Sequence, residues 1–160
     1  MLAMQKITNT KDRRKKIRFF AMKLQFSPFE KALSQLRKSM DYLNSPGAKD
    51  DLELRAQFRA ASIQGFEYSY ELAVKMIRRQ LSEIVATPQE LTQLTFADII
   101  RMAADAGLIT DVKRFLIYRD ARNQTSHTYD ENTADEVVRV IEDFFKDATF
   151  LLQQLKNRNS

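Results

Sequence analysis

A long stretch of this sequence, from about Asp51 to Val85, contains no proline and carries apolar residues at helical spacing. One run of them follows at intervals of three or four residues: Phe66, Tyr70, Ala73, Ile77, Leu81 and Ile84. Leu54, Phe58 and Ala61 extend the pattern backward. Intervals of three and four residues follow one face of an α-helix, so the stretch predicts a single long helix. The two stripes join imperfectly near Gly65, where we expect a bend or a close helix contact.

The flanking segments predict four further helices. Ser27-Pro28-Phe29-Glu30 has a capping serine, a proline at the first position and a glutamate two residues later, which is typical of a helix start. We expect that helix to end at Asn44-Ser45-Pro46-Gly47, and the long helix to break at Thr87-Pro88. The others are a helix capped by Thr95 that stops at Gly107, one from Asp111 to about Asn123, and a last one capped by Thr133 with Glu136. The sequence therefore predicts an all-α, up-down antiparallel bundle of four to five helices.

The net charge of +5 is concentrated at the N-terminus. Residues 1–18 carry seven basic side chains and one acidic one, so the rest of the chain sums to about −1. We expect residues 1–21 to be a basic extension and residues 22–160 to form the domain, with Met22 resembling a natural start. The extension could contact a polyanion, or it could simply be solvated.

Composition excludes several classes of chemistry. The chain has one histidine and no cysteine, so thiolate catalysis and disulfides are impossible and a transition-metal site is not expected. Its three glycines lie far apart, which excludes a P-loop and a dinucleotide fingerprint. No apolar stretch is long enough for a membrane span or a signal peptide, and we expect a soluble, cytoplasmic protein without cofactors. The acidic run Asp50-Asp51-Leu52-Glu53 is interpreted as a complement to a helix dipole.

The residues best suited to catalysis or ligand binding lie together in the segment from Arg119 to Asp130. The helix that leads into it places Val112, Phe115, Arg119, Arg122 and Ser126 on one stripe, which changes from apolar to cationic. An arginine fork on a packed face favours a carboxylate or phosphate partner, and His127 can exchange protons near neutral pH. The simpler interpretation is that Arg119 and Arg122 form salt bridges with Glu67 or Glu71 while His127 caps the helix.

The full run Arg-Asn-Gln-Thr-Ser-His-Thr-Tyr-Asp, residues 122–130, closely resembles the signature of HEPN domains. It is most similar to the branch described as nucleotidyltransferase substrate-binding proteins, or HepT-like toxins. Two further segments agree with this resemblance: Phe66-Glu67-Tyr68-Ser69-Tyr70-Glu71-Leu72-Ala73 and Ala106-Gly107-Leu108-Ile109. The resemblance covers roughly residues 24–156.

The resemblance implies a homodimer in which two copies of the Arg-His motif share a cleft. It also implies pairing with a small nucleotidyltransferase, and for some members a metal-independent endoribonuclease activity that AMP transfer to the motif tyrosine silences. Carried over, Arg122 would bind phosphate, His127 would be the acid or base, and Tyr129 would accept AMP. Asn123, Arg119, Glu67 and Glu71 would support the site.

Two functions remain open at this point. The first is a ribonuclease toxin that acts on RNA and is neutralised by its nucleotidyltransferase antitoxin. The second is a non-catalytic subunit that binds a nucleotide or another substrate for the nucleotidyltransferase. Both would use the same cleft, so the sequence does not separate them.

Overall fold

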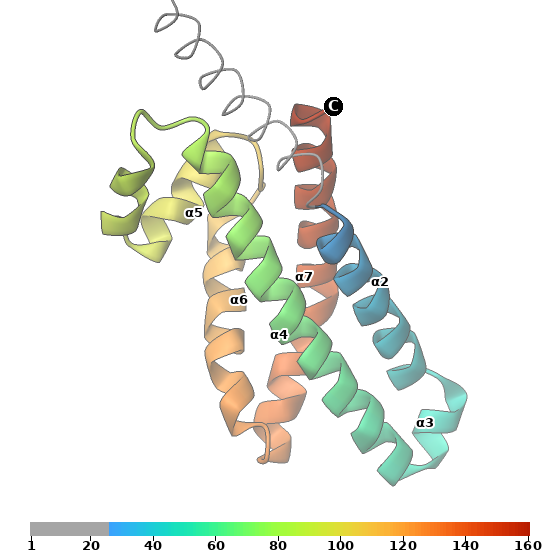
Figure 1. Cartoon of the computed structure of the whole chain (residues 1–160). Helices are drawn as coiled ribbons and strands as arrows, with labels where there is room; N and C mark the ends of the chain where they lie inside the picture. The colour runs from blue at the N-terminus through green and yellow to red at the C-terminus, as the bar shows by residue number, and fades with distance from the viewer. Residues whose placement is uncertain (1–25) are drawn as a thin grey trace, which may run out of the picture.

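The structure, a computed structural model, describes residues 26–160 as an up-and-down bundle of helices without a β-strand (Figure 1). The predicted all-α fold is confirmed. The elements are α2 (Phe26–Leu43), α3 (Pro46–Asp50), α4 (Leu52–Ser82), the 3-10 helix η1 (Pro88–Gln93), α5 (Phe96–Asp105), α6 (Val112–Gln124), the 3-10 helix η2 (Thr125–His127) and α7 (Glu131–Arg158). The basic extension predicted for residues 1–21 lies outside the described residues.

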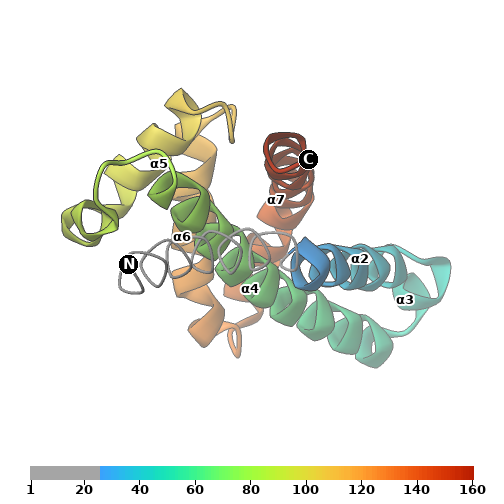
Figure 2. The same ribbon diagram turned by 45° about the horizontal axis from the view of Figure 1, so that its top comes forward.

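The long helix α4 runs through the centre of the bundle and contacts α2, α6 and α7 (Figures 1 and 2). Its first turn is capped by the Asp51 carboxylate, which accepts hydrogen bonds from the backbone N–H groups of Glu53 and Leu54, both at 3.1 Å. The acidic run at residues 50–53 therefore serves a helix start, as the sequence predicts. The expected close contact at Gly65 is also confirmed, because a Cβ atom there would lie 3.3 Å from Leu36 Cδ1 on α2.

The shorter helices begin and end where their capping residues predict. Thr95 and Asp98 form a capping box at the start of α5. Gly107 follows this helix with a φ of 76°, a left-handed conformation that glycine adopts without steric cost. The backbone N–H of Gly107 donates to the Ala104 carbonyl at 2.9 Å, which helps to close the end of α5.

Two predicted helix starts are wrong. Helix α2 already includes Phe26, so Ser27 lies within its first turn and is not the cap. Helix α7 begins at Glu131, two residues before the predicted cap Thr133. The cap is Asp130, whose carboxylate accepts hydrogen bonds from the Thr133 backbone N–H at 2.9 Å and from its hydroxyl at 2.8 Å. Thr133 lies inside the first turn of α7, so it does not occupy the cap position.

Aromatic rings from α4, α6 and α7 meet in the core at Phe144. The Phe144 ring lies edge-on to Phe66 of α4, at 5.0 Å between centroids, and to Tyr118 of α6, at 5.5 Å. All three side chains are almost fully buried. Burial of aromatic rings in this geometry stabilises the packing of the three helices beyond the area they cover. The middle of α6 is thereby packed against α7, which Phe66 joins to α4, and α6 leads into the site described next.

Among the helices of residues 26–160, none combines the length and apolar composition needed to cross a bilayer.

Candidate active site

The segment from Arg122 to Tyr129 forms the turn between α6 and α7, at the lower end of the bundle in Figure 1. Three hydroxyl groups each donate a hydrogen bond to the carbonyl three residues earlier: Thr125 to Arg122 at 2.7 Å, Ser126 to Asn123 at 3.3 Å, and Thr128 to Thr125 at 3.0 Å. The carbonyls at a helix end lack intrahelical partners. The Thr-Ser-His-Thr run therefore satisfies them and tightens the end of α6 into η2.

Arg122 is held by side chains from two elements. Its Nε donates to Glu71 Oε1 on α4 at 3.0 Å, and its Nη2 lies 3.8 Å from Glu67 Oε2. Its Nη1 donates to the Thr125 hydroxyl at 3.0 Å. The Arg122 side chain is 30% exposed, so part of it remains accessible to solvent although the guanidinium contacts the protein. The predicted pairing of Arg122 with Glu67 and Glu71 is confirmed.

Arg119 has a different environment from Arg122. Its guanidinium lies over the Phe96 ring of α5, 4.7 Å from the centroid, and the residue is exposed. This is a cation–π geometry, which requires no carboxylate. Within residues 26–160 no salt bridge joins Arg119 to Glu67 or Glu71, so that alternative holds for Arg122 only. The Asn123 side chain is exposed on α6, and its backbone carbonyl receives the Ser126 hydroxyl.

His127 and Tyr129 project from the same turn. Both residues are exposed, Tyr129 to 86%, and their rings meet edge to face with centroids 6.2 Å apart. Neither side chain donates or accepts a hydrogen bond within the described residues, so the alternative in which His127 caps the helix with its ring finds no support. The exposed imidazole of His127 is accessible to a ligand from outside the chain.

The buried face of α6 is rotated from the predicted stripe. Phe115, Tyr118, Ala121 of α6 and then Thr125 are buried, whereas Arg119 is exposed. Burial of Tyr118 is possible because its hydroxyl donates to Asp147 of α7 at 2.5 Å. Arg114 binds the same carboxylate from Nε and Nη2, at 2.8 and 2.7 Å. Sequence reasoning missed this cluster, in which burial and the Asp147 carboxylate together raise the pKa of the Tyr118 hydroxyl.

Tyr70 of α4 is close enough to Arg119 and Arg122 for their charges to act on its hydroxyl. Burial raises the pKa of its hydroxyl to about 12, and the charges of Arg119 and Arg122 act in the opposite direction. Arg59, also on α4, donates from Nη1 to Asp135 in the first turns of α7 at 3.1 Å. Helix α4 therefore contacts both sides of the turn, through Glu71 before it and through Arg59 after it.

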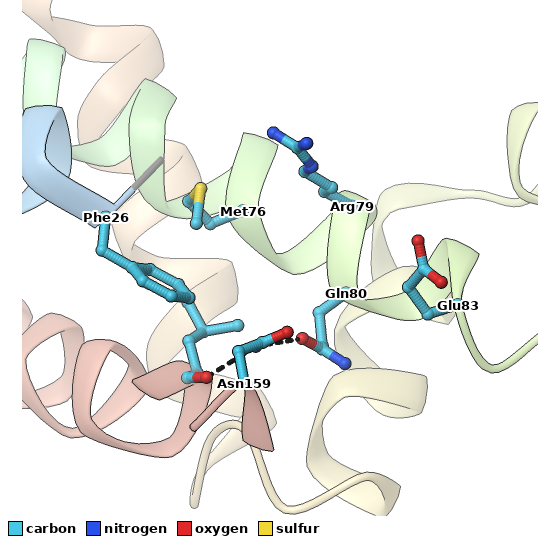
Figure 3. Close-up of a pocket in the computed structure, with 7 residues that line it drawn as sticks. Phe26, Met76, Arg79, Gln80, Glu83 and Asn159 are labelled. Atoms are coloured by element: carbon cyan, nitrogen blue, oxygen red, sulfur yellow. Dashed lines mark hydrogen bonds between the residues drawn. The ribbon is translucent and has the colours of Figure 1, made fainter. Parts of the chain in front are cut away.

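Two hollows in the surface of the described residues lie away from this turn. One is lined by Phe26 with residues of the last turns of α4 and α7, at the opposite end of the bundle (Figure 3). There the Asn159 amide donates to Gln80 Oε1 at 3.0 Å and to the Leu155 carbonyl at 2.6 Å. Another lies between α2 and α4, beside Gly65 and Tyr68. Within residues 26–160 no group of three or more His, Asp or Glu side chains is arranged to hold a metal ion.

The family model described as nucleotidyltransferase substrate binding protein like matches residues 24–157. The chain belongs to this family. A similar curated protein from Haemophilus influenzae, named "Probable ribonuclease HepT", is 45% identical over 100 residues, which are 62% of this chain and 68% of that protein. The resemblance to the HEPN-type nucleotidyltransferase substrate-binding branch is confirmed.

Two solved structures share the fold of this family member. One, from Haemophilus influenzae, is described as the fold of a substrate-binding domain of a nucleotidyltransferase. It is 34% identical, with a TM-score of 0.78 over 82% of this chain and 98% of that chain. The other, from Thermus thermophilus, is 28% identical, with a TM-score of 0.60 over 79% of this chain and 98% of that chain.

Proposed function

We propose that this chain is a metal-independent endoribonuclease whose active site is the turn from Arg122 to Tyr129. The observation that carries the proposal is the contrast within that turn: Arg122 is held by Glu71 and Thr125, while His127, five residues later in the same turn, is exposed. A held cation and an accessible proton carrier are the two groups that cleavage of an RNA phosphodiester needs. The name of the Haemophilus influenzae relative, a probable ribonuclease, supports the same activity.

The reaction uses the nucleophile that RNA itself carries. A base takes the proton of the 2′-hydroxyl, the 2′-oxygen attacks the adjacent phosphorus, and the bond from phosphorus to the 5′-oxygen breaks. An acid donates a proton to that leaving oxygen, so the products are a 2′,3′-cyclic phosphate and a 5′-hydroxyl. His127 supplies the proton transfer, and Arg122 stabilises the negative charge that grows on the phosphoryl oxygens. Asn123 and Arg119 lie on the same helix and support the site.

The chain holds one histidine, whereas the reaction needs both a base and an acid. A two-fold homodimer would bring two copies of the turn together, so that one His127 accepts the proton and the other donates it. The exposure of His127 and of the Tyr129 ring is compatible with such a shared cleft. We therefore propose that the active species is the homodimer.

The partner of this dimer would be a small nucleotidyltransferase, in keeping with the family description. We propose that the partner transfers AMP to Tyr129, whose side chain is 86% exposed and can enter another enzyme's active site. The added phosphate would lie near Arg122 and obstruct the cleft, which silences the ribonuclease. The two proteins would then act as toxin and antitoxin, in the cytoplasm, a location with which a cysteine-free chain is compatible.

The alternative is a non-catalytic subunit that presents a nucleotide substrate to the nucleotidyltransferase. The description of the Haemophilus influenzae structure favours it, since that protein is called a substrate-binding domain. The test is incubation of the purified dimer with RNA in the presence of a chelator, followed by analysis of the product ends. Products with 2′,3′-cyclic phosphate and 5′-hydroxyl ends support the ribonuclease. Saturable nucleotide binding with no cleavage would support the binding subunit instead.

A further inference from the structure

Thr125 is the buried residue in the turn that contacts the Arg122 guanidinium directly. Thr125 is only 6% exposed and lies between α6 and α7. The hydroxyl donates to the Arg122 carbonyl at 2.7 Å and accepts from Arg122 Nη1 at 3.0 Å. One hydroxyl therefore binds the backbone and the side-chain head of the same arginine.

This double contact restricts the arginine more than a single bond would. A hydroxyl has one proton, so donation to the Arg122 carbonyl directs its lone pairs away from that carbonyl. The Arg122 Nη1 group then meets an acceptor of fixed direction. With Glu71 on Nε at 3.0 Å, the guanidinium is held at two points, and its Nη2 also lies 3.8 Å from Glu67 Oε2. A long side chain fixed in advance loses less entropy when it binds a ligand.

The two other hydroxyls of the turn provide an internal comparison. Ser126 and Thr128 make the same type of bond to the carbonyl three residues earlier. Within residues 26–160 neither of them contacts a guanidinium. The turn itself is thus supported by all three hydroxyls, whereas only Thr125 connects the turn to Arg122.

We propose that Thr125 is a positioning residue, which holds Arg122 in the orientation that binds the scissile phosphate of RNA. The inference rests on the proposed ribonuclease function and adds to it a residue that does not touch the substrate. Thr125 acts through Arg122, so its contribution disappears when the guanidinium is absent.

The experiment compares Thr125→Val, which keeps the shape but loses the hydroxyl, with Thr125→Ser, which keeps the hydroxyl, in the full-length dimer. Thr149→Val is the matched control, because it loses a hydroxyl bond to a backbone carbonyl, that of Phe145 on α7, outside the turn. Loss of a hydrogen bond to a charged group predicts a roughly 10- to 100-fold fall in kcat/KM for Thr125→Val. Thr125→Ser and Thr149→Val should stay within about threefold of the unmutated chain. In an Arg122→Lys background, Thr125→Val should add no further loss.

A second readout does not depend on cleavage. The Nη1–H resonances of Arg122, assigned by their disappearance in Arg122→Lys, should exchange faster with water in Thr125→Val and be unchanged in Thr149→Val. Full activity of Thr125→Val, unchanged Arg122 resonances, or failure of Thr125→Ser to restore activity would each overturn the positioning role. If the unmutated chain cleaves no RNA, the proposed function fails, and the resonances alone decide whether Thr125 holds Arg122.

Discussion

Arg122 of α6 and Glu71 of α4 are joined across the two helices by a 3.0 Å hydrogen bond from Nε to Oε1. The bond orients the guanidinium, but it also places a negative charge beside the group that we propose binds phosphate. Glu71 is 61% exposed, so the pair contributes little to the stability of the fold. We therefore propose that the role of this contact is to position Arg122.

Glu71→Gln separates these two effects, because glutamine keeps the acceptor oxygen and removes the charge. We expect the free energy of unfolding to change by less than about 1 kcal/mol in urea denaturation. RNA binding at low salt should become several-fold tighter, since one repulsive charge beside the phosphate is gone. Glu142→Gln, which removes the charge from an exposed pair with Arg37, is the matched control and should leave RNA binding unchanged. Weaker binding by Glu71→Gln would contradict this account.

Tyr118→Phe tests the buried cluster that fixes α6 against α7. The variant keeps the ring packed against Phe144 but removes the donor that lies 2.5 Å from Asp147. Because the buried Asp147 carboxylate loses one hydrogen-bond donor, we expect the free energy of unfolding to fall by roughly 1–3 kcal/mol. Tyr68→Phe, on the exposed face of α4, should cost less than about 0.5 kcal/mol. Equal stability of the two variants in urea would show that the Tyr118 hydroxyl contributes nothing to the fold.

Because of Tyr70, the free energy of unfolding should fall at alkaline pH. Its pKa is about 12 in the folded protein and about 10 in an unfolded chain, so folding favours the protonated hydroxyl. This contribution is fully present below about pH 10 and is lost as the pH rises toward about 12, on the order of 2 kcal/mol. Tyr70→Phe should therefore lose less stability than the unmutated chain between those pH values, as measured by denaturant unfolding. Parallel losses in the two proteins would reject the pKa shift.

Most of the fold could be predicted from the sequence because helical spacing and capping signals are local. The stripe on α4, the capping box at Thr95 and the stop at Gly107 all depend on residues within a few positions of one another. The start of α7 was predicted wrongly because Asp130 and Thr133 are both good caps. In the structure Asp130 takes the cap position, and Thr133 lies inside the helix with its hydroxyl donating to Asp130.

The site was less predictable because its contacts join distant parts of the chain. The pairing of Arg122 with Glu67 and Glu71 could be proposed from the helix pattern, and the structure confirms it. The burial of Tyr118 depends on Asp147, which lies on a helix 29 positions later, and no local pattern reveals that partner. The contact between Thr125 and Arg122 was missed for another reason. Residue types and their spacing do not show which side chain a hydroxyl contacts, so this bond becomes apparent only in three dimensions.

Modification of Tyr129 is tested with the cognate nucleotidyltransferase and ATP. We expect mass spectrometry to show one added AMP on the unmutated chain and none on Tyr129→Phe. Tyr68→Phe is the matched control, because Tyr68 is also exposed, to 58%, and lies on α4 away from the turn. It should be modified like the unmutated chain. AMP on Tyr129→Phe at the unmutated level would place the acceptor elsewhere.

The most direct test of the active site is the single-turnover rate of RNA cleavage, measured in chelator for the unmutated chain and for His127→Ala. His127 is exposed and its ring makes no hydrogen bond within the described part of the chain, so the variant should keep its helical content, melting temperature and oligomeric state. Loss of general acid–base catalysis predicts a rate lower by roughly 10²- to 10⁴-fold. A correctly folded His127→Ala that cleaves RNA as fast as the unmutated chain would contradict the assignment of this turn as the active site.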